Sequence, residues 1–198
     1  YNGHSSVTFF IMLSGFVLSR AYSARMSKGG ISYRTFMVKR IARIWPLHFL
    51  IALPLLVWTF LRDGTSSVPI IAANLMLLQS WVPHYQYYFS LNFPSWTLSA
   101  ELFLYVTFPF LTVLSSRRLL GVCGMALVLS VAAPFAFDLI GQLNSMGANG
   151  DDFANWFTYI NPVIRLSEFS IGIVLYRALS GKYGRILPDF SVFRRSEG

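Results

Sequence analysis

The sequence YRTFMVKRIARIWPLHF, residues 33–49, joins a cluster of cations directly to a long apolar segment. From residue 44 to residue 61 the chain has 18 consecutive positions without a formal charge. A helix rises about 1.5 Å per residue and needs roughly 20 apolar residues to cross the core of a bilayer. This segment therefore predicts a membrane span, and we expect the rest of the chain to be organised around such helices.

The composition agrees with a membrane protein. Hydrophobic residues make up 55% of the 198 residues and charged residues only 12%, whereas soluble domains carry about 25% charged residues. The net charge of +8 would suggest nucleic acid in a soluble protein, but basic residues beside membrane spans commonly set orientation instead. We therefore expect an integral membrane protein in contact with lipid, without a nucleic-acid partner.

The sequence contains no glycine-rich phosphate loop and no cluster of Cys and His with the spacing of metal ligands. Its single cysteine, Cys123, lies in an apolar run and cannot form a disulfide within the chain. We expect neither a metal nor a resident cofactor.

The expected fold is all-α, a multi-pass transmembrane helix bundle of about five spans and one short segment. The expected spans are residues 2–19, 44–61, 96–114, 119–142 and 162–179. The short segment, residues 68–82, contains Pro69, precedes Pro83 and is short for a crossing. If it turns back instead of crossing, Arg117 and Arg118 lie on the same side of the membrane as the first cation cluster, and we favour this topology.

Between Arg20 and Arg43 the chain carries seven basic residues and no acidic one. A short loop of this kind is typical of the cytoplasmic side of a membrane. Gly29 and Gly30 predict a turn, and Ser32 is a plausible N-cap for a helix that runs into the second span.

Three ionisable residues fall inside apolar segments: Glu101, Arg165 and Glu168. Placing such a group in a bilayer costs about 2.5 to 3.5 kcal/mol on insertion scales, so each should face a partner or a wet cavity. Arg165 and Glu168 stand three residues apart and can form a purely structural pair on one helix face. Glu101 has no local cation, so its counter-charge is expected from Arg40, Arg43 or Arg165.

Arg40 and Arg43 stand three apart at the beginning of the second span. The positive-inside rule alone accounts for their charge, whereas a binding site accounts for their spacing, because guanidinium groups bind phosphate bidentately. His48 is a candidate general base reached from the same cavity, although a lone histidine in a membrane helix more often hydrogen-bonds a neighbour.

Four runs of the sequence together resemble a known family. They are VTFFIMLSGFVLS at 7–19, FMVKRIARIWPLHF at 36–49, PSWTLSAELFLYVTFPFL at 94–111 and NPVIRLSEFSIGIVLY at 161–176. In order and approximate spacing they are similar to the integral-membrane acyltransferase 3 family, which includes O-acetylases of O-antigen, peptidoglycan and Nod factors.

The resemblance implies transfer of an acyl group, usually acetyl, from a cytoplasmic acyl-CoA to a hydroxyl of a carbohydrate or lipid-linked acceptor in the bacterial inner membrane. It makes Arg40 and Arg43 candidates for holding the phosphates of the donor. The further substrate-binding candidates are Trp96, Arg165 and Glu168, and the candidate catalytic residues are Glu101 and His48.

The chain departs from the family pattern at its ends. The family's first span, with an arginine and the histidine usually regarded as catalytic, has no counterpart, and His4, His48 and His84 do not match that histidine. We therefore expect one transmembrane domain over residues 1–198 that is incomplete at both ends. The alternatives are a transporter or flippase of a polar or acylated solute, for which intramembrane charges are equally expected, and an inactive truncated family member.

Overall fold

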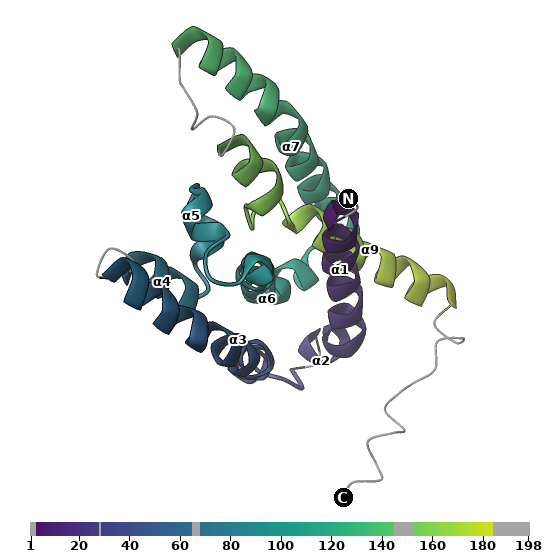
Figure 1. Cartoon of the computed structure of the whole chain (residues 1–198). Coiled ribbons are helices and arrows are strands. Elements are labelled where there is room, and N and C mark those ends of the chain that lie inside the picture. The colour runs from purple at the N-terminus through teal and green to yellow at the C-terminus, as the bar shows by residue number, and fades with distance from the viewer. Residues whose placement is uncertain (1–2, 28, 65–67, 145–152, 184–198) are drawn as a thin grey trace, which may run out of the picture.

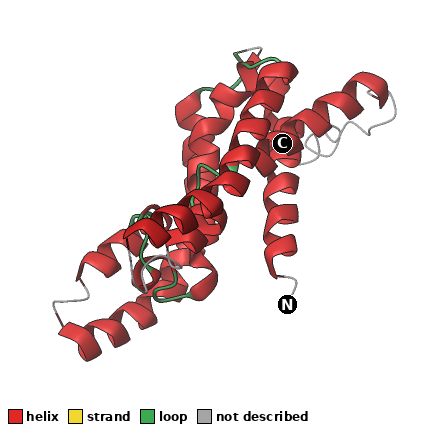
Figure 2. Ribbon diagram, turned by 90° about the horizontal axis from the view of Figure 1, so that it is seen from above, coloured by secondary structure: helices red, strands yellow, loops and turns green. Residues whose placement is uncertain are grey.

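The computed structural model describes residues 3–27, 29–64, 68–144 and 153–183. All regular elements among these residues are helices, and Figure 2 shows them joined by short loops. The expected all-α helix bundle is thereby confirmed. The polar loop expected at Asp151 and Asp152 lies outside the described residues.

The first helical stretch is longer than the span expected at 2–19. It consists of α1 (Gly3–Leu18), a π-helical turn η1 (Ser19–Ser23) and α2 (Ala24–Ser27), which follow one another without a break. The chain then turns back through Gly29, whose φ of 67° lies in the left-handed region that favours glycine.

Helix α3 (Tyr33–Asp63) begins where the sequence predicts. Its N-cap is Ser32, whose side-chain oxygen accepts a hydrogen bond from the backbone N–H of Thr35 at 3.2 Å. The helix is 31 residues long and contains Pro46 and Pro54. In Figure 1 it runs beside α4 and α6.

The segment after α3 is broken into short pieces: α4 (Val68–Leu75), η3 (Gln79–Trp81), α5 (Tyr85–Tyr88) and η4 (Phe93–Ser95). The eight residues of α4 rise only about 12 Å, against a bilayer core of about 30 Å. Residues 68–82 therefore do not cross the membrane as a single helix, which agrees with the expectation of a segment that turns back.

The remaining helices are α6 (Trp96–Val113), α7 (Ser116–Asn144), the π-helical turn η5 (Trp156–Ile160) and α9 (Leu166–Tyr183). By length and composition, four stretches of the described residues can cross a membrane: Ser5–Met26, Tyr33–Asp63, Phe93–Val113 and Ser116–Ala133. Helix α9, expected to form a fifth span, is not among them. Its 18 residues include three charged ones, Glu168, Arg177 and Lys182, so it has no uncharged stretch as long as those of the other spans.

Helix α9 packs against both α1 and α7. The crossing with α1 depends on two glycines, because a Cβ at Gly15 would lie 2.2 Å from the carbonyl oxygen of Phe169 and a Cβ at Gly172 would lie 2.0 Å from that of Met12. Helix α6 contacts α1, α3 and α9 as well. The interface of α1, α3, α6 and α9 is therefore the centre of the bundle, and its core includes Phe36, Leu104, Phe108, Phe169 and Ile173.

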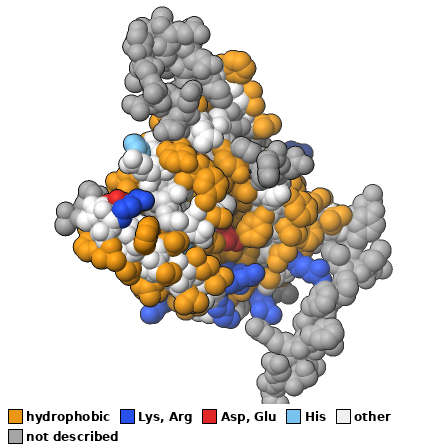
Figure 3. All heavy atoms as spheres, in the orientation of Figure 1, with side chains coloured by type: hydrophobic (Ala, Val, Ile, Leu, Met, Phe, Trp, Pro, Cys, Tyr) orange, Lys and Arg blue, Asp and Glu red, His pale blue; other side chains and the backbone are white. Residues whose placement is uncertain are grey.

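The outer surface is largely apolar. On α3 the side chains of Leu50, Val57 and Leu61 are exposed, and Figure 3 shows hydrophobic side chains over much of one face, with Lys and Arg gathered along its lower edge. Exposed apolar faces on long helices are what contact with lipid requires. The chain is an integral membrane protein.

Candidate functional site

The first polar site inside the bundle is centred on Glu101, whose side chain is buried in α6 with 8% of its surface exposed. Tyr105, four residues later on the same helix face, donates a hydrogen bond from its hydroxyl to Oε1 of Glu101. Ser14 of α1 donates to the same oxygen at 3.5 Å. We call Glu101, Tyr105 and Ser14 the inner cluster.

Arg40 of α3 reaches toward this cluster. Its Nη2 donates to the hydroxyl of Tyr22 at 2.7 Å, and its Cζ lies 4.9 Å from the centroid of the Tyr22 ring. The rings of Tyr105 and Phe36 lie 5.8 and 5.9 Å from the same carbon. The Nε of Arg40 is buried and has no hydrogen-bond partner among the described residues, so the guanidinium retains capacity to bind an anion.

Arg43 is exposed one turn further along α3. Both Arg43 and Arg40 lie within electrostatic range of Glu101. Neither arginine forms a direct ion pair with Glu101 in the described part of the chain. The counter-charge expected for Glu101 therefore comes from α3 at longer range, since Arg165 is engaged elsewhere.

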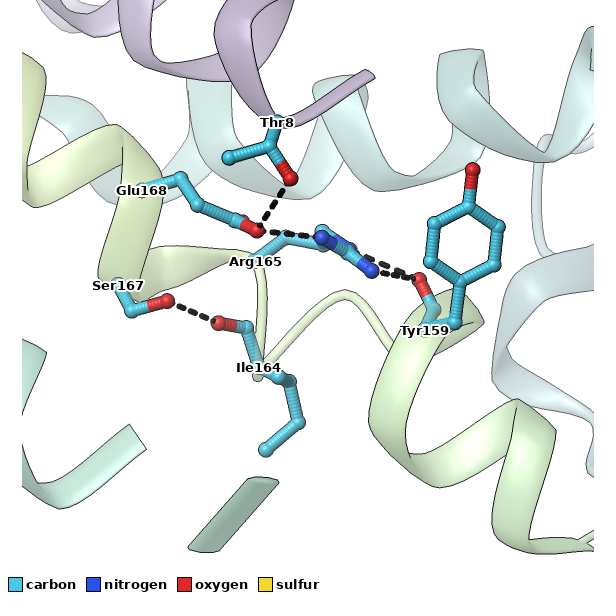
Figure 4. A network of polar contacts seen from close by, with 6 residues as sticks. All are labelled: Thr8, Tyr159, Ile164, Arg165, Ser167 and Glu168. Carbon is cyan, nitrogen blue, oxygen red and sulfur yellow. Dashed lines mark hydrogen bonds and ion pairs between the residues drawn. The ribbon is translucent and has the colours of Figure 1, made fainter. Parts of the chain in front are cut away.

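Arg165 and Glu168 belong to a second polar site, shown in Figure 4. Nη1 of Arg165 pairs with Oε1 of Glu168, and its Nε donates to the carbonyl oxygen of Tyr159 at 2.8 Å. Thr8 of α1 donates to the same oxygen of Glu168 at 3.1 Å. Arg165, 4% exposed, also lies 6.0 Å from the ring centroid of Trp96. We call these five residues the outer cluster.

The two clusters occupy successive levels of one interface. Thr8 and Ser14 are six residues apart on α1, a rise of about 9 Å, and Trp96 and Glu101 are five apart at the start of α6, about 7.5 Å. From the end of the bundle that carries Arg40 toward the opposite end, the order is therefore Arg40, the inner cluster and the outer cluster. Polar groups at this depth are costly unless they are paired or functional.

His48 does not belong to either cluster. It is 5% exposed, and its Nε2 lies 3.0 Å from the carbonyl oxygen of Asn74, which can only accept a hydrogen bond. This contact ties α3 to α4. The structure therefore shows His48 in a hydrogen bond to a neighbour, which is the alternative to a role as general base. The catalytic role of His48 stays a prediction.

Several members of the two clusters, and Tyr22 beside Arg40, were not identified from the sequence. Tyr105 has a visible signal, because it follows Glu101 by four residues on an expected helix. Ser14 and Thr8 are 87 and 160 residues away from the carboxylates that they contact, and no local pattern connects them. Tyr22 lies in the π-helical turn η1, whose local change of pitch cannot be deduced from hydropathy.

The described residues contain no group of three or more His, Cys, Asp or Glu that could hold a metal ion. What the clusters offer is a buried carboxylate held by two hydroxyl donors, with cationic groups nearby on one side. A carboxylate in this setting can accept a proton, and the guanidinium groups can hold an anion. This arrangement suits a reaction between an anionic ligand and a group that loses a proton.

The family described as acyltransferase domain matches residues 1–194 of the chain. A relative called acyltransferase MdmB, from Streptomyces mycarofaciens, is 32% identical over 188 residues, a match that covers 87% of this chain and 46% of the relative. The chain thus spans about half the length of this curated relative. No solved structure matches the chain.

Proposed function

The chain belongs to the acyltransferase domain family, and from this premise we propose that it transfers an acetyl or similar acyl group from acyl-CoA to a hydroxyl of a carbohydrate or related, lipid-linked acceptor. The observation that carries the proposal is that the buried carboxylate of Glu101 lies within electrostatic range of Arg40 and Arg43, where α1, α3 and α6 meet.

The negative charge of acyl-CoA determines where on the protein we expect this donor to bind. Acyl-CoA carries several phosphates and cannot enter the bilayer, so it must be held where the bundle presents cations. Arg40 and Arg43 lie at such an end, which the positive-inside rule assigns to the cytoplasm, here that of a bacterial inner membrane. Guanidinium groups suit phosphates because they stay charged and bind them bidentately. The acyl end of the donor then extends between the helices toward the inner cluster.

The transfer step requires a proton acceptor. The oxygen of the acceptor hydroxyl attacks the thioester carbonyl, its proton passes to the carboxylate of Glu101, and the C–S bond breaks as the thiolate of CoA leaves and takes up a proton. His48 is the second candidate for accepting this proton. It would have to do so through Nδ1, because Nε2 is hydrogen-bonded to the carbonyl oxygen of Asn74.

We expect the acceptor to bind on the side of Glu101 that faces away from Arg40 and Arg43. There the outer cluster presents the indole ring of Trp96 and the ion pair of Arg165 and Glu168. Aromatic rings with a few fixed polar groups are typical of sites for small organic ligands. A hydroxylated acceptor held here lies within one or two helical turns of Glu101.

The test is release of CoA thiol from acetyl-CoA by the purified intact protein in the presence of a hydroxylated acceptor. We expect release that depends on the acceptor and is lost in Glu101→Gln, which keeps the shape of the side chain but cannot accept the proton. A protein that moves its substrate across the membrane without a reaction would release no thiol. That result would overturn the proposal.

A further inference from the structure

A cavity of about 480 Å³ lies at the cationic end of the bundle, between the end of α2 and the first turns of α3. It is lined by Arg25, Gly29, Gly30, Ile31, Ser32, Thr35 and Lys39. Two of these residues are cations, two carry hydroxyl groups and none is acidic. The volume lies within the range of about 300 to 1,000 Å³ that is typical of ligand pockets.

The turn between the helices creates this cavity. The backbone N–H of Gly29 donates to the carbonyl of Met26 at 3.1 Å, and that of Gly30 donates to the carbonyl of Arg25 at 2.7 Å. These bonds close the end of α2 and reverse the chain at once. As a result Arg25, near the end of one helix, and Lys39, near the start of the next, line the same space.

The hydroxyl groups in the cavity are fixed by the cap of α3. The side-chain oxygens of Ser32 and Thr35 lie 2.9 Å apart, and the Ser32 oxygen also accepts a hydrogen bond from the backbone N–H of Thr35. The cavity therefore offers a ligand hydroxyl groups in addition to the two cations.

The cavity adjoins the group that we assign to the donor phosphates. Lys39 directly precedes Arg40, and Arg25 follows Tyr22, the hydrogen-bond partner of Arg40, by three residues. Consecutive residues of a helix point about 100° apart, so Arg40 faces the rings of Tyr22 and Tyr105 while Lys39 faces the cavity. An extended anionic ligand can thus contact both places at once.

We propose that this cavity binds the nucleotide end of the acyl donor, a nucleoside phosphate, with phosphate groups between Arg25 and Lys39. The inference rests on the proposed function and adds a site to it. The positive-inside rule requires cations on this side of the membrane but does not require them to line one cavity with two hydroxyl groups and no carboxylate. A phosphate of an anionic lipid offers the same chemistry, so the test must separate the two sources.

The test compares two donors, acetyl-CoA and acetyl-pantetheine, which lacks the nucleotide. In Arg25→Ala and Lys39→Ala we expect the KM for acetyl-CoA to rise about tenfold with kcat unchanged, since a charge-assisted hydrogen bond to phosphate is lost. The kcat/KM for acetyl-pantetheine should not change. Arg34→Ala is the matched control, because Arg34 is an exposed cation in the first turn of α3 that does not line the cavity.

A second measurement does not depend on turnover of the shorter donor. The nucleotide 3′,5′-ADP should inhibit the reaction competitively against acetyl-CoA, and both cavity variants should weaken this inhibition about tenfold while Arg34→Ala leaves it unchanged. The measurement is made in nanodiscs of neutral lipid and repeated with an anionic lipid added.

Three results would overturn the inference. Equal losses with both donors would show that the two cations act on the fold, and effects that occur only with anionic lipid would show a lipid site. Inhibition by 3′,5′-ADP that the cavity variants leave unchanged would place the nucleotide elsewhere. None of these would contradict acyl transfer itself, which fails separately if the unmodified protein releases no thiol from either donor.

Discussion

Tyr105 donates a hydrogen bond from its hydroxyl to the carboxylate of Glu101, one helical turn earlier on α6. The ring of the same tyrosine lies 5.8 Å from the guanidinium carbon of Arg40. Tyr105 therefore contacts both the proposed proton acceptor and the side chain proposed to hold the donor. It links α6 to α3 through two residues that are 65 positions apart in the sequence.

Tyr105→Phe keeps the ring beside Arg40 but removes the hydrogen bond to Glu101. We expect kcat to fall about tenfold to hundredfold, because a hydrogen bond to a charged group contributes roughly 1.5 to 3 kcal/mol. The KM for acyl-CoA should stay close to its original value. Tyr33→Phe, at an exposed tyrosine that packs against Phe110, serves as the control. Unchanged kcat in Tyr105→Phe would show that this hydroxyl does not assist the reaction.

Tyr22→Phe removes the 2.7 Å acceptor of the Arg40 side chain and leaves the aromatic packing in place. The guanidinium should then be less well oriented, so we expect the KM for acyl-CoA to rise about threefold to tenfold with little change in kcat. Steady-state kinetics over a range of donor concentrations measure this. A fall in kcat at constant KM would contradict a role in donor binding.

Arg40→Ala and Arg43→Ala should abolish acyl transfer while the protein still inserts into the membrane, because each removes a cation that we propose binds a donor phosphate. Arg40→Lys and Arg43→Lys keep the charge that sets orientation but not the bidentate geometry, and they should retain only part of the activity. Activity assays on membranes with matched protein levels check this. Wild-type turnover in both alanine variants at every donor concentration would remove the basis for the phosphate site.

Glu168→Gln should destabilise the bundle by about 3 to 5 kcal/mol, since it leaves the buried charge of Arg165 without its partner. Thermal unfolding in detergent measures the change. The exposed ion pair of Arg62 and Asp63 offers a matched comparison, and Asp63→Asn should have little effect. If the two variants unfolded at the same temperature, the outer cluster would not stabilise the fold.

The crossing of α1 and α9 gives a prediction on stability alone. Gly172→Ala places a Cβ 2.0 Å from the carbonyl oxygen of Met12, so the helices must move apart at a cost of about 1 to 3 kcal/mol. Gly124→Ala on α7 is the control, because a Cβ there meets nothing within 4 Å. Unfolding temperatures that fall equally in both variants would argue against this packing.

Much of the fold follows from local features of the sequence. Long apolar runs identified the first four spans, and Ser32 identified the start of α3 because capping depends on neighbouring residues only. The pair of Arg165 and Glu168 was predictable for the same reason, as the two residues stand only three positions apart.

What could not be predicted depends on contacts between distant parts of the chain. Ser14 reaches Glu101 only because α1 packs beside α6, and Tyr22 reaches Arg40 only because η1 departs from α-helical geometry. The short helices between Val68 and Ser95 are held by long-range bonds such as that of His48 to Asn74. Hydropathy alone shows none of these contacts.

The central claim is that the end of the bundle carrying Arg40 and Arg43 faces the compartment that holds acyl-CoA. The most direct measurement is labelling of Arg43→Cys, in a Cys123→Ser background, with a thiol reagent that does not cross membranes. We predict labelling in inside-out vesicles and none in intact cells, because Arg43 is exposed at the cationic end, which we propose faces the cytoplasm. Labelling from the outer surface of intact cells would contradict the account.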